Sequence, residues 1–73
     1  MTLQQLKYVV AIDRYRSFAS AAEALDVTQP TLSGMVGKLE EELDVKLFER
    51  TSRRVATTPT GAKIVEQAQR ILM

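Results

Sequence analysis

The 73-residue chain contains no cysteine, no histidine and no tryptophan. Without cysteine there is no disulfide and no thiol nucleophile, and without histidine there is no imidazole base and none of the usual zinc sites. A small hydrolase therefore has little support, because the serines and threonines lack a group that would activate them. We expect no catalytic activity, no metal and no cofactor.

Long apolar runs are absent as well, and none approaches the roughly 18 residues that span a bilayer. The first ten residues, MTLQQLKYVV, lack the basic start and the uninterrupted apolar core of a signal peptide. We therefore expect a cytoplasmic protein without a membrane partner. Aromatic residues make up only 5% of the chain and hydrophobic residues 45%, which indicates one helical domain with an aliphatic core.

The net charge is only +1, but the charges are unevenly distributed. Acidic residues cluster at positions 40–42 and 44, and basic residues follow at Lys46, Arg50, Arg53 and Arg54. Such a domain can present one cationic face to a polyanion while remaining nearly neutral overall. Two solvated faces of opposite sign would give the same pattern, so charge alone leaves both interpretations open.

The stretch from Ser17 to Leu43 has the pattern of two short helices joined by a tight turn. Apolar residues recur in each half at spacing i, i+3, i+4 and i+7, which places them on one face of a helix. They are Phe18, Ala21, Ala22 and Leu25 in the first half, and Leu32, Val36, Leu39 and Leu43 in the second. Only residues 26–28 remain for the turn, and this predicts a helix-turn-helix.

The start of the second of these helices is small, polar and uncharged. Thr28 is its predicted N-cap, and Pro30 is tolerated because the N–H groups of the first turn have no partner within the helix. Such N–H groups can donate to a phosphate, so Thr28 is also among the predicted DNA contacts, although a plain capped helix start explains this segment equally well. The side chains offered to solvent can form hydrogen bonds without carrying charge, as a surface that reads base edges must. They are Gln29, Thr31, Ser33 and Gly34.

Further elements are predicted on both sides of this stretch. An amphipathic helix should run from Leu3 to about Tyr15, with Thr2 as N-cap and Gln5 completing a capping box, and Ser17 should cap the next helix. We interpret both tyrosines, Tyr8 and Tyr15, as packing residues at the rim of the core.

After position 43 the apolar residues alternate, with Val45, Leu47 and Val55 on the inward side, so residues 47–57 should form a hairpin with Arg53 near its tip. A basic ribbon of this kind is a wing, whose partner is the sugar-phosphate backbone or the minor groove. An alternative is an interdomain hairpin whose arginines pair with carboxylates elsewhere.

The last predicted helix begins with Thr58 as cap and Pro59 at its first position. Its apolar residues cover more than one stripe, so we expect the helix to continue into a further region and to pair with a second copy of itself. The residues predicted to form this contact are Ile64, Val65, Ala68, Ile71 and Leu72.

Taken together, these segments resemble the N-terminal DNA-binding domain of a LysR-type transcriptional regulator. The matching pieces are LQQLKYVVAI, SFASAAEALDVTQPTLS, KLEEELDVKLFERTSRRV and TPTGAKI, which cover nearly the whole chain. Within that family, TQPTLSG followed by ERTSRRV is most similar to the peroxide-sensing OxyR branch. The resemblance implies a mainly α fold with a small β-hairpin: a winged helix-turn-helix over residues 1–58, then a linker and dimerisation helix over 59–73.

The same resemblance implies a bacterial, dimeric regulator that binds promoter DNA with its third helix in the major groove. The positions that match the family's DNA contacts are Ser17, Phe18, Gln29, Pro30, Thr31, Ser33 and Gly34, and those that match its wing are Arg50, Arg53 and Arg54. The linker helix pairs antiparallel between two subunits and leads to an effector domain absent from this chain, and a tetramer of the full-length protein is left open.

The chain departs from the family pattern at several positions. Many members carry Arg at positions 34 and 37 and a polar residue such as Gln at position 35, where this chain has Gly34, Gly37 and Met35. Because contacts from those longer side chains are missing, Lys38 joins the residues expected to read the DNA. Asp44 stands where the family has Gly, and it should end its helix in a left-handed conformation. Thr57 replaces a common Leu and should weaken the inward contact of its strand. The rival hypothesis is a winged-helix module that binds another protein.

Overall fold

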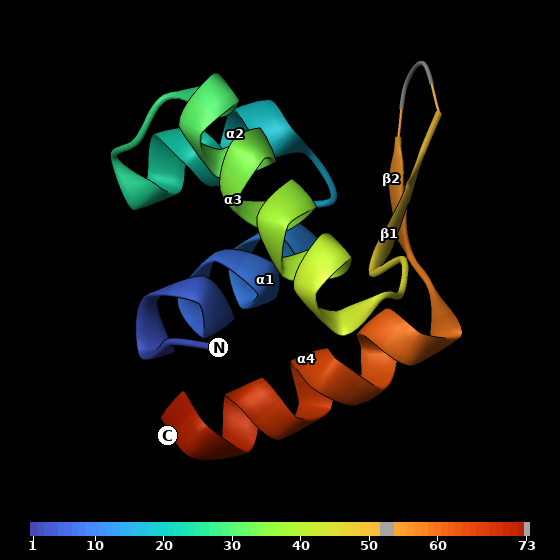
Figure 1. Cartoon of the computed structure of the whole chain (residues 1–73). Coiled ribbons are helices and arrows are strands. Elements are labelled where there is room, and N and C mark those ends of the chain that lie inside the picture. Colours follow the sequence, from blue (N-terminus) through green and yellow to red (C-terminus); the bar gives the residue numbers. More distant parts are fainter. Residues whose placement is uncertain (52–53, 73) are drawn as a thin grey trace.

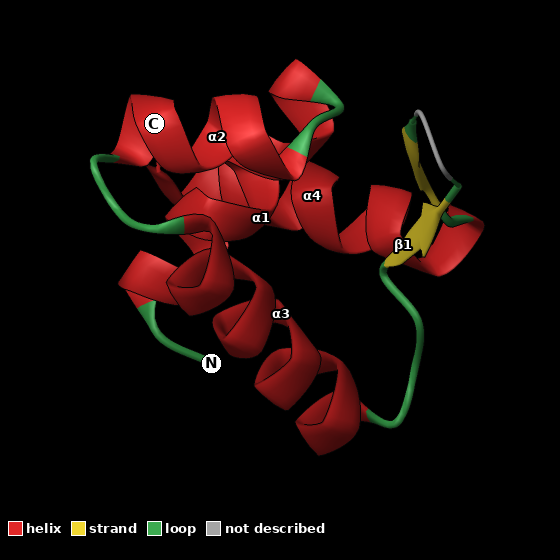
Figure 2. Ribbon diagram, turned by 90° about the horizontal axis from the view of Figure 1, so that it is seen from above, coloured by secondary structure: helices red, strands yellow, loops and turns green. Residues whose placement is uncertain are grey.

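The computed structural model describes residues 1–51 and 54–72. The elements are α1 (Leu3–Tyr15), α2 (Phe18–Leu25), α3 (Gln29–Leu43), β1 (Phe48–Arg50), β2 (Val55–Thr57) and α4 (Pro59–Leu72). The strands β1 and β2 pair antiparallel as a hairpin, which stands to one side of the helices (Figure 1; Figure 2). The predicted mainly α fold with a small hairpin is confirmed.

All four helices begin with a hydroxyl cap. The side-chain oxygens of Thr2, Ser17, Thr28 and Thr58 each accept a hydrogen bond from the backbone N–H three residues further on, at 2.9 to 3.2 Å. Gln5 makes the reciprocal hydrogen bond at the first cap: its Oε1 accepts from the backbone N–H of Thr2 at 2.9 Å. The predicted caps and the predicted capping box are therefore present, and each satisfies N–H groups that a helix start leaves unpaired.

The first three helices all end in a left-handed residue that is not glycine. Arg16, Asp26 and Asp44 have φ angles of 54°, 58° and 55°. This confirms the left-handed conformation predicted for Asp44 at the end of α3. Aspartate tolerates this conformation better than most residues, because its short polar side chain can bond locally.

The core forms around α1, which packs against α2, α3, α4 and β2. Its largest fully buried side chains are those of Val9, Ile12, Leu32, Val36, Leu39 and Leu47. Tyr8 is also part of this core, with 6% of its surface exposed, so the prediction that it lies at the rim is wrong. Its phenol oxygen accepts a hydrogen bond from Gln4 Nε2 at 3.2 Å. Tyr15 is 45% exposed.

The hairpin turns two consecutive side chains inward. Leu47 is fully buried as predicted, but Phe48 beside it is buried as well, so the expected alternation fails at the start of β1. On β2, Thr57 is half-buried and its Oγ1 donates a hydrogen bond to Asp13 Oδ1 on α1. The strand β2 thus has a polar link to α1 at this position.

The inner face of α4 is used within the chain itself. Val65 and Ala68 are 5% and 0% exposed, and α4 packs on α1 along this face. These two residues were predicted to meet a second copy, but in this structure they are covered by the chain's own core. Of the predicted contact residues, Ile71 is 58% exposed, and Ile64 and Leu72 are half-buried.

The start of α4 is held tightly against the residue that precedes β1. The backbone N–H of Thr58 donates to the carbonyl oxygen of Leu47 at 2.9 Å, and the Thr58 hydroxyl donates to the carbonyl oxygen of Lys46 at 2.6 Å. A Cβ added to Gly61 would lie against that same Leu47 carbonyl, well inside van der Waals contact. Glycine at 61 therefore allows α4 to approach the hairpin base this closely.

We predict that Gly61→Ala lowers the free energy of unfolding by about 2 kcal/mol, because the added methyl group forces α4 away from Leu47. Gly37→Ala is the matched control, since nothing lies within 4 Å of a Cβ built at Gly37. That change should raise stability by about 0.5–1 kcal/mol through helix propensity alone. Urea unfolding followed by circular dichroism measures both, and equal effects of the two substitutions would contradict the close approach.

Candidate nucleic-acid interface

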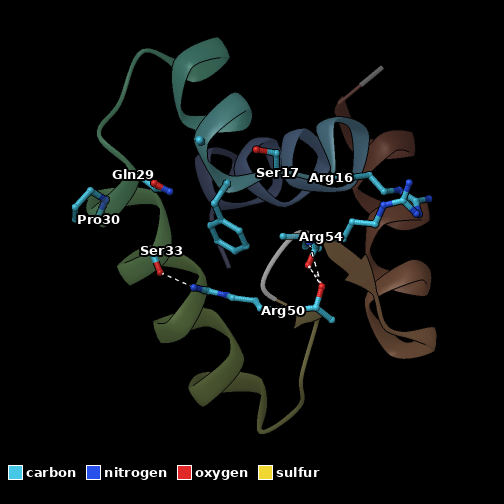
Figure 3. Close-up of a pocket in the computed structure, with 11 residues that line it drawn as sticks. Arg16, Ser17, Gln29, Pro30, Ser33, Arg50 and Arg54 are labelled. Carbon is cyan, nitrogen blue, oxygen red and sulfur yellow. Dashed lines mark hydrogen bonds between the residues drawn. The ribbon is translucent and has the colours of Figure 1, made fainter.

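An open groove of about 440 Å³ lies where α2, α3 and the hairpin meet (Figure 3). It brings together most of the residues that were predicted to contact DNA. Those that line it are Ser17, Phe18, Gln29, Pro30, Ser33, Arg50 and Arg54. The helix-turn-helix and the hairpin therefore contribute to one continuous surface, as a winged helix requires.

The other predicted contact residues lie outside the lining of this groove. Thr28, Thr31, Gly34 and Lys38 are exposed on α3 or at its cap. The Thr28 hydroxyl donates to Thr31 Oγ1 at 2.8 Å and also accepts the capping bond, so both side chains help to hold the start of α3. Arg53 lies outside the described residues.

Arg50 connects the hairpin to both helices of the helix-turn-helix. Its guanidinium carbon lies 3.9 Å from the centroid of the Phe18 ring on α2, which is the arrangement of a cation–π contact. Its Nη1 donates a hydrogen bond to Ser33 Oγ on α3 at 3.0 Å. Figure 3 shows this side chain reaching across the groove from the hairpin toward Ser33. The cation is therefore held at the surface by a ring and a hydroxyl group.

Phe18 is the platform for this contact. Its side chain is only 7% exposed, and its ring meets the ring of Phe48 edge to face, with centroids 6.4 Å apart and an interplanar angle of 84°. Phe48 and Arg50 stand two residues apart on β1 and therefore on the same face of the strand. Arg50 covers the outer face of the Phe18 ring, so Phe18 contributes to the groove surface by holding the guanidinium in place.

The groove is strongly cationic. Its lining holds three arginines, Arg16, Arg50 and Arg54, and no acidic residue. Within residues 1–51 and 54–72, the salt bridges join the N-terminus to Glu42 and Arg70 to Glu66, so neither Arg50 nor Arg54 pairs with a described carboxylate. The alternative of an interdomain hairpin needs carboxylates from elsewhere, since none in the described part of the chain pairs with these two arginines.

Arg16 is a groove residue that the sequence patterns did not indicate. It ends α1 in the left-handed conformation and precedes the Ser17 cap, so it lies in a turn that periodicity does not describe. Figure 3 shows its side chain and that of Arg54 extending to the same side of the groove. The only sequence signal was a basic residue immediately before a predicted helix start.

Glu40, which lies outside the lining of the groove, fixes the base of the hairpin to α3. Its Oε2 accepts hydrogen bonds from the backbone N–H groups of Leu47 at 2.7 Å and of Phe48 at 3.3 Å. The sequence placed Glu40 only in the acidic cluster at positions 40–42 and 44, whereas in the structure it is half-buried and has this specific role. The acidic cluster therefore contains one residue that sets the position of the hairpin.

Known proteins are similar to this chain over nearly its whole length. The model of the family described as "Bacterial regulatory helix-turn-helix protein, lysR family" matches residues 3–62. OxyR of Escherichia coli K12, a "DNA-binding transcriptional dual regulator", is 49% identical over 72 residues, and a "Hydrogen peroxide-inducible genes activator" of Haemophilus influenzae is 47% identical. Both alignments cover 99% of this chain and 24% of the relative, so the chain spans about a quarter of their length. These relatives confirm the predicted OxyR-like branch.

A solved structure with the same fold is that of the BenM DNA-binding domain with benA site 1 DNA. It superposes with a TM-score of 0.94 at 44% identity, covering 99% of this chain and 81% of that one. The expected winged helix-turn-helix is thereby confirmed.

None of the helices within the described ranges has the length and hydropathy to cross a bilayer.

We predict that Glu40→Ala lowers the free energy of unfolding by about 1–3 kcal/mol, because it leaves backbone N–H groups at the base of the hairpin without an acceptor. Amide hydrogen exchange at Leu47 and Phe48 should accelerate more than exchange within α1. Urea unfolding and exchange detected by NMR measure the two effects.

The matched control for this prediction is Glu41→Ala, which removes an exposed carboxylate from the same turn of α3. It should change stability by less than about 0.5 kcal/mol. If both substitutions had the same effect on Leu47 exchange, Glu40 would have no special part in holding the hairpin.

Proposed function

Because the chain belongs to the lysR family of bacterial regulatory helix-turn-helix proteins, we propose that it binds double-stranded DNA in a sequence-dependent manner as part of a transcription regulator. In this proposal the start of α3 enters the major groove, and the hairpin contacts the sugar-phosphate backbone or the minor groove. The observation that carries it is the groove itself, in which three arginines and the polar start of α3 share one surface without an acidic residue.

The two kinds of contact have separate residues on this surface. Arg16 and Arg54 supply positive charge at its edge, where phosphates bind without regard to sequence. Gln29 and Ser33 supply neutral hydrogen-bonding groups, of the kind that distinguish base edges. Gly34 adds backbone that no side chain covers, since nothing lies within 4 Å of a Cβ built there. This face of α3 can therefore approach a groove wall closely.

We also propose that two copies pair through α4. Ile71 is exposed over more than half of its surface, and Ile64 and Leu72 are half-buried beside the face that packs on α1. A symmetric dimer would set the two α3 helices on half-sites about one helical turn of DNA apart. The full regulator would act in the cytoplasm as a binding protein rather than an enzyme, and would form a dimer or a tetramer.

Selection of duplexes from a random pool at low salt, followed by affinity measurements as salt rises, tests this proposal. The expected result is an enriched inverted repeat, with affinity falling by orders of magnitude between about 50 and 200 mM salt. Salt-sensitive binding without an enriched sequence would overturn the reading of bases by α3. Binding to another protein that persists unchanged over the same salt range, without binding to DNA, would favour an interaction module instead.

We predict distinct effects from two substitutions in the groove. Ser33→Ala should reduce discrimination at one base position by about 1 kcal/mol, while Arg54→Ala should weaken binding to every duplex and reduce the slope of log affinity against log salt by about one. Titration of a panel of single-base variants at several salt concentrations measures both. An equal loss across all duplexes for Ser33→Ala would remove Ser33 from the residues that read bases.

A further inference from the structure

The hydrogen bond between Arg50 and Ser33 constrains what Ser33 can offer to DNA. A guanidinium group has only donors, so Ser33 Oγ is the acceptor of this 3.0 Å bond. A serine hydroxyl has one O–H donor and two lone pairs. The bond to Arg50 uses a lone pair and leaves the O–H free.

No hydrogen bond is donated by the Ser33 hydroxyl to any residue of the described ranges. Its proton is therefore available to an outside acceptor. A positive charge 3.0 Å from the oxygen also opposes the approach of a second donor, because the amino hydrogens of a base carry partial positive charge. Both effects make the exposed side of Ser33 a donor.

Arg50 is held where it imposes this polarity. The face of Phe18 lies 3.9 Å from its guanidinium carbon, and the edge-to-face contact with Phe48 keeps the Phe18 ring in place. Phe48 is itself fixed to α3, since its backbone N–H donates to Glu40. The hairpin, α2 and α3 thus hold the guanidinium together, and it is already in position before any ligand arrives.

We propose that Arg50 is a positioning residue that makes Ser33 a hydrogen-bond donor toward the base it meets, so that this base is not cytosine. The inference depends on the proposed function. In the major groove, guanine offers O6 and N7, adenine offers N7 and thymine offers O4 as acceptors, whereas cytosine offers only the N4 amino donor. Ser33 therefore selects against one base, and Arg50 on the hairpin is the cause.

The test starts from the duplex that the wild-type chain selects, and uses Ser33→Ala to identify the base position that Ser33 meets. All four bases are then placed at that position, and their affinities are measured for the wild type, R50M, S33A and the S33A/R50M double variant. The wild type should bind the cytosine duplex about fivefold more weakly than the best duplex. In R50M this ratio should fall to within about twofold. In the S33A background, adding R50M should leave the four-base profile unchanged.

Two further variants are controls. R50K retains a side chain that only donates, so it should keep most of the cytosine penalty. R54M removes a groove arginine that makes no bond to Ser33, so it should weaken all four duplexes by the same factor. Thermal unfolding by circular dichroism checks that each variant is folded. If R50M is not folded, the cytosine penalty measured with R50K is the result that can overturn the inference.

The possible failures separate the inference from the proposed function. If R50M weakens all four duplexes equally and keeps the cytosine penalty, Arg50 is a phosphate contact, and the inference is overturned while sequence-specific binding stands. The inference is also overturned, and sequence-specific binding stands, if the wild type selects a sequence but S33A changes the base preference at none of its positions. Loss of the penalty in folded R50K would also overturn the inference. A wild type that enriches no sequence would overturn both.

Discussion

Leu47 is the residue at which α3, the hairpin and α4 are joined, and the position of the groove depends on it. Its side chain is fully buried, its N–H donates to Glu40, and its carbonyl oxygen accepts from Thr58. Gly61 lies against the same carbonyl group. Because both backbone groups of this buried residue have partners, the chain can leave the core here without an unsatisfied polar group. The base of the hairpin is thereby fixed to two helices at once.

The hairpin needs this support because it is very small. Its strands have three residues each, and a two-stranded ribbon of that size is not stable alone. Residues in a strand advance by about 3.3 Å, so the distance from Leu47 to Arg50 is about 10 Å along β1. That length carries the guanidinium from the core to the surface beside Ser33. The anchor at Leu47 and the contact with Phe18 hold β1 at both ends, and together they form one wall of the groove.

Local features of this fold could be predicted from the sequence, because they join residues close together in the chain. The helix from Leu3 to Tyr15 and the caps at Thr2, Ser17 and Thr28 depend on apolar spacing and on hydrogen bonds spanning three residues. Of the residues that line the groove, Gln29, Ser33, Arg50 and Arg54 were named from their polarity or charge and their place in the predicted elements. Ser17, Phe18 and Pro30 were named only from the resemblance to a family. No single segment shows that the hairpin lies beside α2 and α3.

Features that depend on distant residues could not be predicted in this way. The inward turn of Phe48 and the bonds of Glu40 and Arg50 connect residues seven or more positions apart, and nothing in the periodicity specifies them. Apolar residues on α4 posed a different difficulty. A pattern shows that Val65 will be buried, but it does not show whether α1 or a second copy of the chain covers it. In the structure, Val65 is buried on the side of α4 that packs against α1.

The hydroxyl caps have a consequence for the balance between stability and affinity. Aspartate caps helices as well as serine or threonine does, and an acidic residue in an exposed first turn stabilises a helix by a further ~0.3–1 kcal/mol. All four helices nevertheless begin with uncharged caps and have no acidic residue in the first turn. At α2 and α3, whose starts border the groove, a carboxylate would repel an approaching phosphate. The chain thus lacks an available gain in folding free energy, and under the proposed function the partial positive charge of those helix ends stays available to the phosphates of DNA.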